Sequence, residues 1–209
     1  MIKLFRFVCL ILLTSYHSSG MSDTDMYCTI MEAENEKCHI ESNTQSYLIS
    51  AEGTLIRDKD NKTITFRLPK KHHIETVQYK PFENKIIFTF SVSDGDSGSI
   101  LVSVFDEDNY LFEWQTELFA FNTSPVLIHN NAIYLGGIGV IAKLNLYDGS
   151  IIWRHTGLYE PETQAYNAFE MPVIKKEFVI FKEQKVSDTG YSGIREIHVL
   201  DKTGKIIKK

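Results

Sequence analysis

One local pattern repeats along this chain: a polar turn is followed by a short strand that carries an aromatic or apolar residue. The turns occupy residues 58–61, 106–109, 147–150 and 201–204. Phe66, Trp114 and Trp153 follow the first three turns, and Ile206 follows the fourth. The turns recur at intervals of roughly 40 to 55 residues, which is the period of a four-stranded propeller blade. This repeat predicts a chain built from consecutive small antiparallel sheets.

The clearest copy covers residues 132–157. Residues 132–135 are apolar and are followed by Gly136-Gly137, where we expect the first strand to stop. Residues 140–146 alternate with a period of two, which indicates a half-buried strand. Asp148-Gly149 supplies the positive φ that a tight hairpin needs, and residues 151–154 form the returning strand.

This copy resembles a blade of the quinoprotein-like (PQQ-repeat) β-propellers, whose motif is A-x-D-x-x-T-G-x-x-x-W. Lys143, Asn145, Asp148, Gly149 and Trp153 occupy the motif positions, and Gly149 and Trp153 match by identity. The resemblance implies that Trp114 and Trp153 dock one blade against the next. It does not extend to the quinone cofactor, because the chain has no adjacent cysteines and no calcium-ligand set.

The predicted fold is therefore all-β: a small or partial β-propeller of about four blades, formed by a single domain over residues 21–209. Three units cover about 79–118, 123–157 and 170–209, and a divergent unit precedes Leu68. A β-sandwich is the alternative. The last unit is either frayed or completed by the segment around Cys28 to Ile40, which would close the ring and remove open sheet edges.

Residues 1–20 read as a secretory signal peptide. Lys3 and Arg6 precede an apolar run, and Ser18-Ser19-Gly20 supplies small residues for cleavage. An uncleaved anchor remains the alternative. We expect a periplasmic or secreted protein. The net charge of −5 and the lack of a large basic cluster argue against a nucleic-acid partner.

Cys28 and Cys38 are the two cysteines outside the signal segment. In an oxidising compartment they most simply pair with each other, closing one small loop. Two buried thiols are the alternative.

The segment Gly95-Asp96-Ser97-Gly98 resembles the nucleophile loop of trypsin-like secreted proteases. Such proteases place a catalytic His far upstream in a defined context, which this chain lacks, so a tight turn between two strands is the preferred interpretation. A secreted serine hydrolase that uses Ser97 remains the alternative function. The histidines and acidic turns lack metal-ligand spacing, so we expect no metal site.

The predicted function is that of an exported, non-enzymatic protein-binding module. Its partner would be another protein, either an envelope component that it helps to assemble or a secreted effector that it inhibits as an immunity protein. No cofactor is expected. The long polar loop after Thr156 is the predicted contact region, because loops on a rigid scaffold commonly carry binding residues. The contact residues are Tyr159, Glu160, Glu162, Gln164 and Tyr166.

Overall fold

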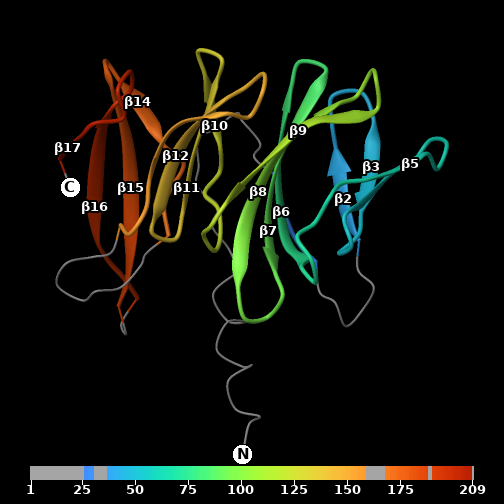
Figure 1. Ribbon diagram of the computed structural model, residues 1–209, viewed down its shortest axis with the longest axis horizontal. Helices are drawn as coiled ribbons and strands as arrows, with labels where there is room; N and C mark the ends of the chain where they lie inside the picture. The colour runs from blue at the N-terminus through green and yellow to red at the C-terminus, as the bar shows by residue number, and fades with distance from the viewer. Residues whose placement is uncertain (1–25, 31–36, 159–167, 188–189, 209) are drawn as a thin grey trace, which may run out of the picture.

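The computed structural model describes residues 26–30, 37–158, 168–187 and 190–208, and this part of the chain consists of strands and connecting loops. Four antiparallel sheets stand side by side in chain order, from β2–β5 at one end to β14–β17 at the other (Figure 1). No helix in the described ranges is long and apolar enough to cross a membrane. The predicted signal peptide lies outside the described residues.

Each sheet is a meander in which consecutive strands pair. The first sheet contains β2 (Cys38–Glu41), β3 (Ser46–Ile49), β4 (Thr54–Arg57) and β5 (Thr63–Thr65). The second contains β6 (His73–Phe82), β7 (Lys85–Ser93), β8 (Gly98–Asp106) and β9 (Leu111–Leu118), with β1 (Met26–Thr29) added beside β6. The third contains β10 (Leu127–His129), β11 (Ala132–Gly137), β12 (Val140–Asn145) and β13 (Ile151–His155). The fourth contains β14 (Val173–Lys175), β15 (Phe178–Ser187), β16 (Gly190–Leu200) and β17 (Ile206–Lys208).

The all-β prediction is confirmed, and the sheets fall close to the predicted repeat units. The four consecutive antiparallel sheets are consistent with a partial β-propeller. The proposal that the N-terminal segment completes the last unit is wrong. β1 pairs with β6 of the second sheet. β2 pairs with β3 of the first sheet, where Cys38 and Ile40 are buried.

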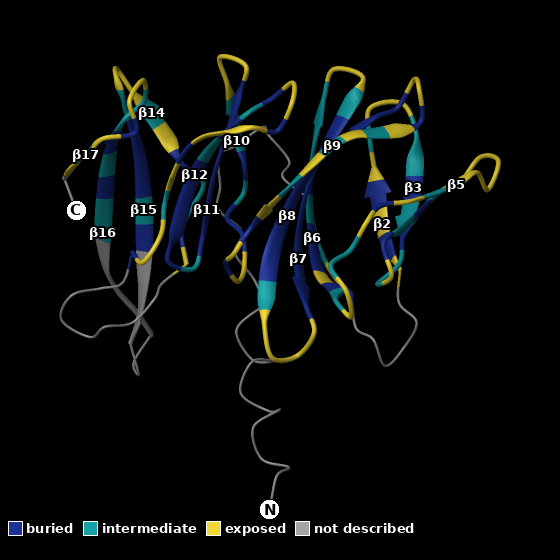
Figure 2. Cartoon of the chain, in the orientation of Figure 1, coloured by how far each residue is buried: buried dark blue, intermediate teal, exposed yellow. Residues whose placement is uncertain are grey.

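Three hydrophobic clusters join the four sheets in a line. One lies between the first and second sheets, one between the second and third, and one between the third and fourth. Within the described residues, no such cluster connects the first sheet to the fourth, and the two lie at opposite ends of the molecule (Figure 1). The array is therefore open. Figure 2 shows the buried residues concentrated along the strands and the exposed residues in the connecting loops.

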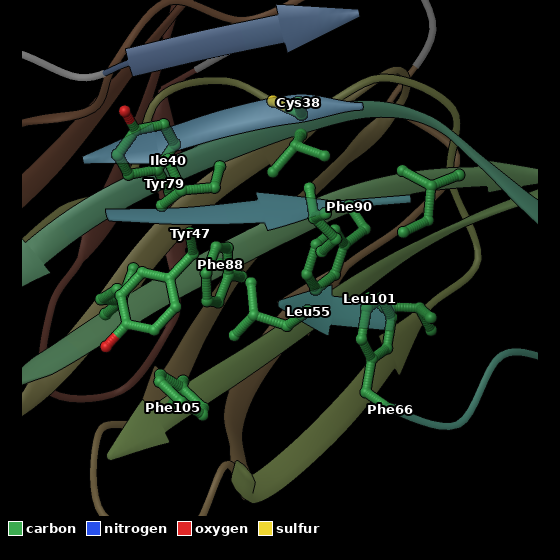
Figure 3. Packing of buried hydrophobic residues seen from close by; sticks show 14 of the residues in the cluster. Cys38, Ile40, Tyr47, Leu55, Phe66, Tyr79, Phe88, Phe90, Leu101 and Phe105 are labelled. Carbon is green, nitrogen blue, oxygen red and sulfur yellow. The ribbon is translucent and has the colours of Figure 1, made fainter. Parts of the chain in front are cut away.

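The first cluster is the richest in aromatic residues (Figure 3). Phe66 stacks on Phe90, with ring centroids 4.4 Å apart, and Phe90 stacks on Phe88. Tyr47 meets Phe105 edge to face at 5.6 Å. Such pairs add to the free energy gained by burial alone, so this interface is held largely by side-chain packing.

A repeated tryptophan contact holds the second and third interfaces. The Trp114 indole N–H donates to the carbonyl of Leu146 in the next sheet, and the Trp153 N–H donates to the carbonyl of Asp201, both at 3.0 Å. Each ring lies against a turn glycine of that next sheet, Gly149 or Gly204. The prediction that the two tryptophans dock sheet against sheet is confirmed.

A second hydrogen bond accompanies each tryptophan. Two residues after Trp114, the Thr116 hydroxyl donates to the Gly149 carbonyl at 2.6 Å. Two residues after Trp153, the His155 Nε2 lies 2.6 Å from the Gly204 carbonyl. The equivalent side chains therefore make the same pair of contacts at both interfaces.

The first interface uses different groups, because Phe66 has no indole N–H. Tyr110 occupies the turn position of Gly149, at φ 53°, and its hydroxyl donates to the Lys62 carbonyl of the first sheet. The neighbouring Glu107 is 3% exposed, and its carboxylate accepts bonds from three hydroxyl groups of the first sheet. The donors are Ser42, Thr44 and Tyr47.

A disulfide also crosses this interface. Cys28 lies on β1 in the second sheet, and Cys38 begins β2 in the first, with Cα atoms 5.8 Å apart. The predicted pairing is confirmed. The bond closes a short loop in sequence, and it also joins two sheets that lack the tryptophan contact.

The strand predicted to stop before Gly136 continues through Gly137. Both glycines pair with β12, and both leave room for close neighbours. A Cβ on Gly136 would lie 2.7 Å from the Phe169 Cβ, and one on Gly137 would lie 2.5 Å from the Ile100 side chain. These glycines therefore allow close packing within a strand rather than ending it.

We expect Gly149→Ala to destabilise the protein by about 3 kcal/mol, because the new methyl group would collide with the Trp114 ring and because φ is 68°. Gly157→Ala is the matched control: φ is 67°, but nothing lies within 4 Å of the place that its methyl group would take. It should cost about 1 kcal/mol. Urea unfolding measures both variants, and equal losses would show that the Trp114 contact contributes nothing.

Reduction of the disulfide should lower the free energy of unfolding by roughly 3 kcal/mol, the value expected for a loop of this length. Urea unfolding with and without reductant measures the change. The double variant Cys28→Ala/Cys38→Ala should start at the lower stability and should not respond to reductant. An oxidised wild type that unfolds at the same urea concentration as the double variant would contradict this expectation.

Candidate functional site

Two phenylalanines are exposed in the loop that follows β9. Phe119 is 75% exposed and Phe121 is 51% exposed. Large apolar side chains that gather on a surface commonly mark an interaction site. Phe119 and Phe121 are here called the aromatic pair.

The residues next to this pair are buried. Leu118 and Ala120 are buried in the cluster between the second and third sheets. The chain bends at Phe119 and again at Phe121. With Leu118 and Ala120 packed in the cluster, Phe119 and Phe121 are left on the solvent side.

Close backbone contacts fix the position of Phe121. Its ring lies directly over Gly98 at the start of β8, where a Cβ would collide with it. Its carbonyl accepts a hydrogen bond from Ile138 in the β11–β12 turn, at 2.8 Å. In the same turn, the Gly139 carbonyl accepts a bond from Leu158 at 3.0 Å. Phe121 and Leu158, which precedes the predicted contact residues, are therefore both tied by backbone bonds to the β11–β12 turn.

The predicted contact residues in that loop lie outside the described residues. They are Tyr159, Glu160, Glu162, Gln164 and Tyr166. They stay a prediction.

Ser97 lies in the exposed hairpin between β7 and β8, as the turn interpretation predicted. The Asp94 carboxylate accepts bonds from the backbone N–H groups of Ser97 and Asp96, at 2.8 and 3.0 Å, and from the Ser97 hydroxyl at 3.1 Å. The Ser97 N–H first, and then the Asp96 N–H and the Ser97 hydroxyl, lower the pKa of Asp94 to about 2. Asp94 is thus ionised at neutral pH and shapes the turn.

The contact with Asp94 affects whether Ser97 can act as a nucleophile. A nucleophilic serine needs a base that accepts its proton near neutral pH. A carboxylate with a pKa of about 2 is a weak base, and it is the group that the Ser97 hydroxyl contacts. Among the described residues, no cluster of three or more His, Cys, Asp or Glu side chains could hold a metal ion.

Sequence reasoning did not select the aromatic pair. The signal was the Leu-Phe-Ala-Phe sequence at 118–121, which is apolar at all four positions. That pattern does not tell which of the four are buried. The neighbouring sheet decides it, because it covers Leu118 and Ala120.

No protein-family model matches the chain, and no curated protein matches it. Among solved structures, the chain is similar to the computationally designed Ika4 protein, at 13% identity and a TM-score of 0.46, over 80% of this chain and 94% of that one. It is similar to BamB from Moraxella catarrhalis at 12% identity and a TM-score of 0.33, over 88% and 78% of the two chains.

A quinohemoprotein alcohol dehydrogenase from Pseudomonas putida is also similar, at 11% identity and a TM-score of 0.43. That match covers 78% of this chain and 32% of the dehydrogenase. Likeness at this level does not assign the chain to a family. The sheet topology itself supports the propeller-like fold.

We expect no labelling of the wild-type protein by a fluorophosphonate probe at neutral pH, because Ser97 contacts Asp94 rather than an effective base. In-gel fluorescence measures the labelling, with a serine protease as positive control. Labelling of the wild type that disappears in Ser97→Ala would contradict the turn interpretation and support a hydrolase.

Proposed function

We propose that this chain is an exported, non-enzymatic protein-binding module that acts in the periplasm or after secretion. Its partner is another protein, either an envelope component or a secreted effector. The exposed aromatic pair carries the proposal. The signal-like segment at residues 1–20 and the Cys28–Cys38 disulfide support export to an oxidising compartment.

The aromatic pair suits a binding surface for two physical reasons. Phenylalanine loses little side-chain freedom on binding and removes a large apolar area from water. Phe121 is held by the ring contact with Gly98 and by its backbone bond to Ile138. A partner would therefore meet a surface that is already ordered, which lowers the entropic cost of binding.

Two narrower roles remain within this function. An assembly scaffold would hold an envelope component, and an immunity-type inhibitor would cover the active site of a secreted effector. The identity of the captured partner distinguishes them, since only the second role predicts loss of the partner's catalytic activity in the complex.

The test is affinity capture with residues 21–209 as bait, in lysate of the source organism, comparing wild type with Phe119→Ser. We expect one stoichiometric partner on the wild type and at least a tenfold lower yield on the variant, in line with loss of an interface hot spot. Phe119 is largely exposed, so the variant should keep the wild-type melting temperature.

Ile152→Ser is the matched control. Ile152 is another exposed apolar residue, on the outer strand β13. It should retain the partner at the wild-type yield. Equal capture by all three baits would remove the aromatic pair from the binding surface, and capture of no protein by the wild type would argue against a binding module.

A further inference from the structure

A patch of polar side chains is buried between the second and third sheets. Thr76 and Gln78 lie on β6, directly opposite Ser91 and Thr89 on β7. All four belong to the same sheet face as Ile87, which packs toward the third sheet. The opposite face of these strands supplies the aromatic cluster with the first sheet.

The oxygen atoms of this patch are buried and unsatisfied. Thr89 is 1% exposed and Ser91 is 5% exposed. Within the described protein, no hydrogen-bond partner is found for the hydroxyls of Thr76, Thr89 and Ser91 or for the Gln78 side-chain oxygen. Each such atom costs about 1–3 kcal/mol if it stays unpaired, so a whole patch without partners would be a heavy loss of stability.

The orientation of Gln78 is fixed by a neighbour. Its amide nitrogen donates to the Thr123 carbonyl at 2.7 Å, and Thr123 bridges to Gly137 of the third sheet. This bond uses the amide nitrogen and leaves the Gln78 amide oxygen without a hydrogen-bond partner. The oxygen is an acceptor, whereas the opposite Thr89 hydroxyl can donate or accept.

The space beside these atoms is small. A cavity of about 10 Å³ is lined by Gln78, Tyr79, Ile87, Thr89, Pro125 and Val126. That volume is close to the minimum that holds one water molecule. It is too small for a sugar or another polyol, although a row of hydroxyls would otherwise suit one.

We propose that Gln78 and Thr89 form a binding site for an ordered water molecule between the second and third sheets. The water donates to the Gln78 amide oxygen and accepts a bond from the Thr89 hydroxyl. It satisfies both atoms and links them across the strand pair. This makes the polar half of the second interface a hydrated contact, next to the dry apolar half formed by Ile100, Val102 and Val104.

The sign of a stability change tests the site. Thr89→Val keeps the shape of the side chain and removes the hydroxyl. If a water molecule occupies the site, the variant removes one of the water's two hydrogen-bond partners, and the melting temperature should fall by about 3 °C. If the site is dry, the variant removes an unpaired hydroxyl and the melting temperature should rise, which would overturn the proposal.

A direct measurement makes the test independent of stability. In wild-type protein, NMR should show transfer from a long-lived water to the Gln78 side-chain amide, and Thr89→Val should lose it. Thr63→Val is the control variant, since Thr63 is exposed on β5 of the first sheet, away from this interface, and it should leave the transfer unchanged. No transfer in the wild type would overturn the proposal. So would a melting temperature that rises with potassium but not with choline chloride at equal ionic strength, because that result would assign the site to a cation.

Discussion

The contact between a tryptophan of one sheet and a turn of the next is the interaction on which this array depends. Strand pairing lies within each sheet, so neighbouring sheets hold together mainly through side chains. Trp114 and Trp153 meet this need with a large buried ring and an N–H bonded to a backbone carbonyl. Gly149 and Gly204 allow the ring to approach the backbone. The relative position of neighbouring sheets is thus fixed by the indole hydrogen bond and the ring–glycine contact as well as by apolar burial.

The first interface shows what is required when that contact is missing. Phe66 keeps the apolar ring but offers no donor, and the turn opposite carries Tyr110 in place of glycine. The ring and the hydrogen bond are therefore supplied from the other sheet, through the Tyr110 hydroxyl and the buried Glu107 carboxylate. The Cys28–Cys38 bond adds a covalent link. The three interfaces consequently differ in chemistry: aromatic and covalent at the first, partly polar at the second, and indole-centred with a Lys143–Asp201 ion pair at the third.

An open array has two end sheets, and the first sheet presents polar residues on the face that has no neighbouring sheet. Its outward face carries the polar residues His39, Glu41 and Asp58, with His39 and Asp58 3.3 Å apart. Terminal repeats of stacked proteins usually present such polar faces to water. The aromatic pair in the loop after β9, by contrast, is apolar and exposed.

The sequence by itself determined the repeat, most strands and the turns, because strand periodicity and turn residues act over a few neighbouring positions. The docking role of the tryptophans followed from the resemblance to a propeller blade. It also indicated the Cys28–Cys38 pair and the hairpin around Ser97. Only the tertiary structure decided that the array is open, that β1 joins the second sheet, and that Gly136 and Gly137 lie within a strand. The same holds for the candidate site, since residues 118–121 are all apolar and the neighbouring sheet decides that Leu118 and Ala120 are the ones it covers. These features depend on packing between segments that are distant in sequence, and no local sequence pattern specifies that packing.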